Sequence, residues 1–148
     1  MDKNLYSKLY NSRMLKDNQE CETFLQSIDL LAETFCEDDI TELCTIFDDK
    51  TNDSEIMFSA IHLLETLPSE TAFINTINGL MILNQTSPEW TSIIIYRCLN
   101  DDFSIQMIKK VYTNLSADVI TQFEEKLKEI KNEDCEKFGK AVDEILLH

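Results

Sequence analysis

The 148-residue chain is poor in the residues that make tight turns, with only two glycines and two prolines. A β-sandwich or β-barrel of this length needs a turn every ~8–12 residues, and four such residues cannot supply them. A glycine-rich phosphate-binding loop is also excluded, because Gly79 and Gly139 are isolated from each other. The shortage of turn-forming residues therefore leaves a mostly helical protein.

Long apolar runs and regular cysteine spacings are also missing. Apolar runs do not exceed four residues, as in 93–96, far short of the ~18 of a membrane span, and residues 1–8 show no secretory signal. The five cysteines contain no CxxC pair, and only His62 and His148 could join a thiolate in a metal site. We therefore expect free thiols in a reducing cytoplasm, no metal and no cofactor.

Negative charge, in contrast, is abundant and unevenly spread. The chain has 13 lysines and arginines against 28 aspartates and glutamates, a net charge of −15. Residues 20–55 contain twelve acids and one base, whereas residues 1–19 carry a small net positive charge. Such a protein repels nucleic acid and membranes but attracts a basic protein partner. The alternative is a solvated acidic surface that only prevents aggregation.

Helical periodicity runs through the chain. In residues 20–35, acids lie on one side of the predicted helix and an apolar set on the other: Cys21, Phe24, Leu25, Ile28, Leu31, Ala32 and Phe35. Residues 1–18 fit either a short helix or a weakly ordered arm. Capping residues, among them Asp53, Ser69, Ser87 and Ser116, divide the remainder into helices at about 38–47, 54–67, 69–84, 87–100, 101–115, 116–130 and 133–147.

These features predict an all-α fold with a single domain over residues 1–148. We expect seven to eight antiparallel helices in a small HEAT-like stacked array, with an irregular bundle as the alternative. Gly79, inside a helix, predicts a close helix crossing. In the last helix we expect an inward side formed by Cys135, Phe138, Val142 and Ile145.

One pair of residues in helix 87–100 combines an aromatic side chain with a charge. Trp90 and Arg97 share one side of this apolar helix, so we expect a part-buried guanidinium with an anionic partner. Asp101 and Glu65 are the candidate partners. The pair is either an internal contact or an anchor for a protein partner, and loss of one member of a buried pair would cost several kcal/mol.

The sequence contains no arrangement typical of an enzyme. Nucleophilic catalysis needs a histidine beside a serine or cysteine, and His62 is the only internal histidine. His62 and Glu65 lie one turn apart, but this is half of a two-helix metal motif whose second half is missing. We therefore expect no catalytic residues and no enzymatic activity.

Three segments in order resemble a known family. They are Ile61-His-Leu-Leu-Glu65, Ser87-Pro-Glu-Trp90 and Ile95-Tyr-Arg-Cys-Leu-Asn-Asp101. Together they resemble the all-helical immunity proteins of bacterial polymorphic-toxin systems, in the family numbered thirty. The resemblance covers about a third of the chain. Its motif positions, which either support the fold or bind the partner, are His62, Glu65, Trp90, Arg97, Asn100 and Asp101.

The resemblance implies a cytoplasmic antitoxin that binds the C-terminal domain of a secreted or contact-delivered toxin, as in contact-dependent growth inhibition. The charge suggests a basic toxin, such as a nuclease, and we expect a monomer rather than an oligomer. A helical-repeat adaptor for another basic protein is the alternative. We expect the partner to contact eight acids: Glu22, Asp29, Glu33, Glu37, Asp38, Asp39, Asp48 and Asp49.

Overall fold

A computed structural model of the chain describes residues 1–147, so the candidate ligand His148 lies outside the described residues. Residues 1–147 contain nine α-helices, two 3-10 helices and no strand, which confirms the all-α prediction. The α-helices are α1 Lys3–Ser12, α2 Asn18–Ala32, α3 Ile40–Cys44, α4 Ser54–Leu64, α5 Glu70–Leu83, α6 Pro88–Leu99, α7 Asp102–Val111, α8 Ala117–Glu133 and α9 Cys135–Leu146. The number exceeds the expected seven to eight because the first segment forms an ordered helix and does not remain an arm.

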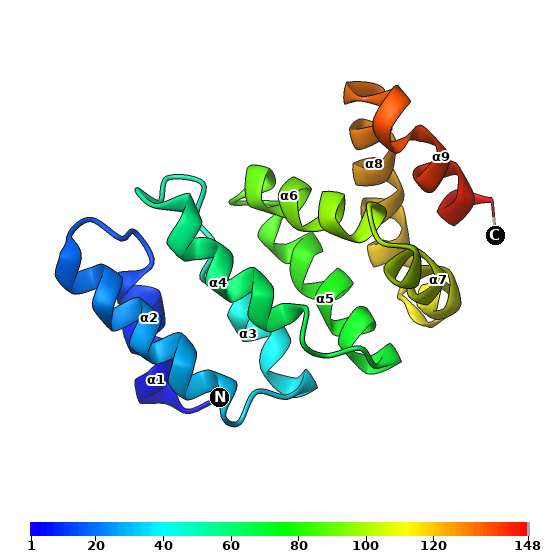
Figure 1. The fold of residues 1–148 in the computed structure, drawn as a ribbon. Helices are drawn as coiled ribbons and strands as arrows, with labels where there is room; N and C mark the ends of the chain where they lie inside the picture. Colours follow the sequence, from blue (N-terminus) through cyan, green and yellow to red (C-terminus); the bar gives the residue numbers. More distant parts are fainter. Residues whose placement is uncertain (148) are drawn as a thin grey trace.

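The helices stack beside one another to form an array with α1 and α2 at one end and α8 and α9 at the other (Figure 1). α1 packs on α2, α2 lies against α4, and α8 packs on α9. α5 lies at the centre, where it contacts α3, α6, α7 and α8. None of the helices in residues 1–147 is both long and apolar enough to cross a membrane.

Most helices begin where the sequence predicted, because their caps are local. In each case a side-chain oxygen accepts a hydrogen bond from the backbone N–H three residues further on, which satisfies a donor that the helix leaves unpaired. These bonds are 3.0–3.2 Å long. The capping residues of α4, α5, α7 and α8 are Asp53, Ser69, Asp101 and Ser116.

The close crossing predicted at Gly79 is confirmed where α5 packs on α3. A Cβ atom at position 79 would lie 2.8 Å from the Cys44 sulfur, which is closer than real Cβ atoms approach. Glycine therefore permits this contact. The neighbouring Cys44 is buried, and burial raises the pKa of its thiol to about 12.

The inward side of the two end helices is narrower than predicted. In α2, Phe24, Ile28 and Leu31 are buried, but Leu25 is 39% exposed and Ala32 is also exposed. In α9, Cys135 is exposed as well, whereas the other three predicted inward residues are buried. The reason is position: among residues 1–147, no helix covers the outer side of the helices at the ends of the array (Figure 1).

Candidate functional site

The outward side of α2 and of its C-cap residue carries three exposed carboxylates, Glu22 and Asp29 in the helix and Glu33 at the cap. At 3.6 residues per turn they lie within about 40° of one another around the helix. Leu25 and Leu30 flank this stripe on its two sides and are 39% and 53% exposed. We call these five residues the α2 acidic surface.

The carboxylates of the α2 acidic surface have no partners within residues 1–147. Among the described residues, no hydrogen bond or ion pair reaches the side chains of Glu22, Asp29 or Glu33, although the basic helix α1 packs beside α2. Asp38, in the 3-10 helix Glu37–Asp39, is exposed and equally unpaired within residues 1–147. These four acids therefore keep their charge available to a partner.

Asp39, in contrast, points into the protein. It is 6% exposed, its Oδ1 lies 2.9 Å from the Met1 amino group, and its Oδ2 accepts a hydrogen bond from the Cys36 N–H at 3.1 Å. Burial alone would raise the pKa of Asp39, but these bonds outweigh burial and lower it. Hydrogen bonds to Asp39 and Glu42 also raise the pKa of the Met1 amino group to about 10. The expectation that Asp39 faces a partner is therefore inconsistent with its burial.

Asp48 and Asp49 join residues 37–49 to α6. The Asp49 carboxylate accepts hydrogen bonds from the backbone N–H groups of Glu89 and Trp90, each at 3.0 Å, and so caps α6 from 40 residues away. Asp48 lies 3.5 Å from Arg13. The expected cap, Ser87, donates its hydroxyl to the Phe47 carbonyl instead. Asp49 is thus a structural residue of this joint.

Two of the eight predicted partner residues thus have a clear structural role, and two others have weaker internal contacts. Glu37 accepts a hydrogen bond from the Ser69 hydroxyl at 3.0 Å and is half-buried, as is Asp48. The eight predicted acids therefore divide into two groups within residues 1–147. Glu22, Asp29, Glu33 and Asp38 are unpaired, whereas Glu37, Asp39, Asp48 and Asp49 are engaged within the chain.

Trp90 is part of the core. It is 4% exposed, and its ring centroid lies 5.7 Å from that of Phe47 and 5.6 Å from that of Phe58. The indole Nε1 donates a hydrogen bond to the Asp48 carbonyl at 2.9 Å. Trp90 therefore supports the joint between residues 47–49 and α6, where a partner cannot reach it.

Arg97 pairs with Glu65, one of its two candidate partners. Its Nε and a terminal nitrogen lie 2.7 and 2.8 Å from the two Glu65 carboxylate oxygens. Their side chains are 39% and 42% exposed, so the pair is more open than expected. Solvent screening makes the expected loss of several kcal/mol too large for such a pair. The guanidinium lies over the Phe58 ring, 5.8 Å from its centroid, and not on Trp90.

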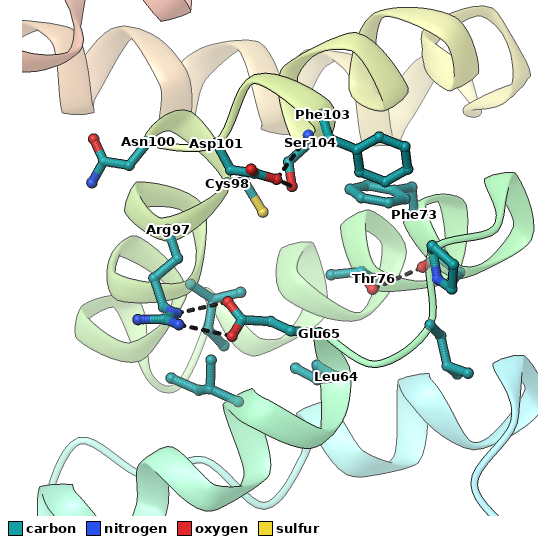
Figure 2. Close-up of a pocket in the computed structure, with 15 residues that line it drawn as sticks. Leu64, Glu65, Phe73, Thr76, Arg97, Cys98, Asn100, Asp101, Phe103 and Ser104 are labelled. Carbon is teal, nitrogen blue, oxygen red and sulfur yellow. Dashed lines mark hydrogen bonds and ion pairs between the residues drawn. The ribbon is translucent and has the colours of Figure 1, made fainter.

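The Glu65–Arg97 pair lines a cavity of about 460 Å³ (Figure 2). The end of α4, the start of α5, the end of α6 and the start of α7 enclose it. Asn100 and Asp101 also line it, so four of the six motif positions meet here. The Asn100 side chain points away from the other labelled side chains (Figure 2). His62 is exposed on α4, next to the Phe58 ring, and does not line the cavity.

The chemistry of the cavity is that of a binding site with mixed apolar and charged walls. Ile61, Leu64 and Ile94 contribute apolar surface. Burial, with the nearby charges of Glu65 and Asp101, raises the pKa of the Cys98 thiol to about 12, so this thiol stays protonated at neutral pH. No cluster of three histidine, cysteine or acidic residues in positions 1–147 is arranged to hold a metal ion.

Sequence reasoning missed the aromatic wall of the cavity. Phe73 of α5 and Phe103 of α7 pack edge to face, with ring centroids 6.2 Å apart. Phe103 lies on the polar side of α7, roughly opposite the buried Ile105. The sequence signal for this wall is Phe103, an aromatic residue that lies outside the apolar side of the amphipathic helix α7.

Comparison with known proteins supports the resemblance seen in the three short segments. The family model described as Immunity protein 30 matches residues 11–108, more than half of the chain. The match runs from α1 into α7 and includes the α2 acidic surface and all six motif positions. No curated protein and no solved structure matches the chain significantly. The chain belongs to the Immunity protein 30 family.

Proposed function

We propose that this protein binds a cognate toxin domain and neutralises it, and that the α2 acidic surface contacts a basic part of that toxin. Membership of an immunity protein family supports toxin neutralisation in general. The observation that supports the site is the set of unpaired carboxylates at Glu22, Asp29 and Glu33.

Physical chemistry favours this surface for fast and specific association. Unpaired carboxylates on one side of a helix attract a basic protein over several ångströms and raise the association rate at low salt. The flanking Leu25 and Leu30 supply apolar area whose burial on contact would favour binding. Asp38 is a further exposed acid that is unpaired within residues 1–147, while Asp39 and Asp49 are left out because their carboxylates are engaged within the chain.

The sign of this surface also suggests the class of toxin. A toxin that cleaves nucleic acid binds a polyanion, so its active site is basic and an acidic protein can cover it. We therefore propose a basic nuclease domain as the target, bound in the cytoplasm, where such a toxin would meet its substrate. The immunity protein would act by occupying this site and would break no bond itself.

Co-expression tests this function directly. The chain is produced with the toxin domain encoded beside its gene, followed by a pull-down and a growth-rescue assay. We expect a stable complex and restored growth. A variant in which the charge of three exposed acids of α8 and α9 is reversed should still bind the toxin and restore growth, because these acids lie outside the α2 acidic surface. They are Asp118, Glu125 and Glu136. Absence of a complex with that domain, or a complex without rescue, would contradict the proposed function.

A further inference from the structure

We propose that the cavity between α4 and α7 binds a basic side chain of the toxin, preferably arginine. This inference rests on the proposed function and adds a second contact to it. The site lies on helices other than α2, which packs against α4 (Figure 1). A toxin loop that inserts one arginine here would fix the orientation that the α2 acidic surface alone leaves open.

The charge of the cavity fits a cation. Arg97 brings a positive charge, but Glu65 holds it in a bidentate pair, so these two residues cancel. Asp101 then leaves one negative charge uncompensated. Its Oδ2 accepts hydrogen bonds from the Ser104 N–H and hydroxyl at 3.0 and 2.7 Å, while no bond to its Oδ1 occurs in residues 1–147. The neighbouring Asp102 is exposed and adds to this field.

The aromatic wall selects the type of cation. Phe103 is 53% exposed, and its contact with Phe73 holds the ring in place. A planar guanidinium can stack on an exposed ring and reach a carboxylate at the same time, which an ammonium does less well. The same chain already contains such a stack, since the Arg13 guanidinium carbon lies 3.8 Å from the Tyr10 ring centroid.

The size and layout of the cavity also suit one long side chain. Its volume of about 460 Å³ falls at the lower end of the ~300–1,000 Å³ of typical ligand pockets. In Figure 2 the Glu65–Arg97 pair and the Phe73–Phe103 pair lie on opposite sides, with Asp101 and Ser104 along one edge. An arginine stem would pass along the apolar wall, with its head between Phe103 and Asp101.

Two short peptides test the site on the full chain. The probes are an acetylated and amidated Gly-Arg-Gly peptide and the same peptide with citrulline, which has nearly the same shape but no charge. Both are titrated in ¹H–¹⁵N NMR spectra of the protein. We expect saturable shifts of the amide signals of residues 98–104 with the arginine peptide, and binding of the citrulline peptide weaker by about fivefold or more.

Two variants and one control locate the binding. Asp101→Asn keeps a cap oxygen for α7 but removes the charge, and Phe103→Ala removes the exposed ring. Each substitution should weaken binding of the arginine peptide by about threefold or more. Asp118→Asn in the first turn of α8 makes the same chemical change away from the cavity and should have no effect. Equal binding of the two peptides to the unaltered protein, or shifts confined to other helices, would overturn the proposal.

Toxin binding separates this proposal from the proposed function. If the unaltered protein binds the toxin domain but Asp101→Asn and Phe103→Ala bind it as tightly, the cavity proposal fails and the proposed function stands. If the unaltered protein does not bind the toxin domain, the proposed function fails, and the cavity loses its toxin ligand. Weaker binding by both variants, with Asp118→Asn unchanged, supports the proposal.

Discussion

Two acidic regions follow each other in the chain, and their carboxylates have different roles. On the α2 acidic surface, Glu22, Asp29 and Glu33 face solvent and have no partner in the described part of the chain. In residues 37–49, Asp39 binds the Met1 amino group and Asp49 caps α6. The difference shows that a high density of acids does not itself define a binding surface. What matters is whether a helix N-terminus or a cation of the same chain lies within reach.

The largest effect on stability is expected where residues 47–49 pack against α6. Trp90→Ala removes a buried indole, its contacts with two phenylalanine rings and its hydrogen bond to the Asp48 carbonyl. We expect a loss of about 3–5 kcal/mol in the free energy of unfolding, measured by urea denaturation. The exposed Phe103→Ala should cost about 1 kcal/mol or less. Equal losses of unfolding free energy in the two variants would contradict the distinction between the buried contact at Trp90 and the exposed ring of Phe103.

A smaller effect on stability is expected when this contact between residues 47–49 and α6 loses only the Asp49 carboxylate. Asp49→Ala removes two hydrogen bonds at the start of α6 and should lower the free energy of unfolding by about 1–2 kcal/mol. Asp49→Asn keeps one acceptor oxygen, so its loss should be smaller. Asp38→Ala, the matched change at an unpaired acid, should stay within about 0.5 kcal/mol. A loss at Asp38 as large as at Asp49 would show that both acids are structural.

The contact between Asp39 and the Met1 amino group makes stability depend on pH at both ends of the range. The amino group has a pKa of about 10 in the folded chain against an ordinary value of 8.0, so its contribution is complete below pH 8 and is lost as the pH rises towards 10. The pKa of Asp39 is lowered, so its contribution is present above pH 3.8 and disappears on further acidification. Denaturation curves should show both decreases, reduced in Asp39→Asn. Parallel pH profiles for the two proteins would contradict this contact.

A small stability effect is also expected at the Glu65–Arg97 pair. Both side chains are about two-fifths exposed, so water screens the attraction and hydrates whichever charge remains. Glu65→Gln should therefore cost about 1 kcal/mol or less, measured by thermal and urea unfolding. A loss of several kcal/mol would show that the pair is desolvated and behaves like the buried contacts of the joint.

Local features of the fold could be predicted from sequence, and distant ones could not. The caps at Asp53, Ser69 and Ser116 depend on hydrogen bonds between residues three positions apart, so the sequence shows them directly. Asp49 caps α6 through backbone N–H groups 40 and 41 residues later in the chain, which no local pattern reveals. Leu25 follows the apolar period of α2, but periodicity does not show how much of that side a neighbour covers.

The candidate site shows the same division between local features, which the sequence predicts, and contacts between distant helices, which it does not. The α2 stripe follows from helical spacing alone, so its three acids were found together. The cavity needs four helices to meet, and the motif positions Glu65 and Arg97 gave one of its walls. Its aromatic wall, Phe73 with Phe103, pairs residues from two different helices and was not predicted.

The association rate with the cognate toxin domain tests the role of the α2 acidic surface most directly. Glu22, Asp29 and Glu33 are changed to lysine together, and the control changes Asp118, Glu125 and Glu136 to lysine, so both variants gain the same charge. At low salt we expect the α2 variant to associate about tenfold more slowly or worse, with the difference shrinking at high salt, and the control to change far less. An unchanged rate and an unchanged salt dependence in the α2 variant would contradict the account.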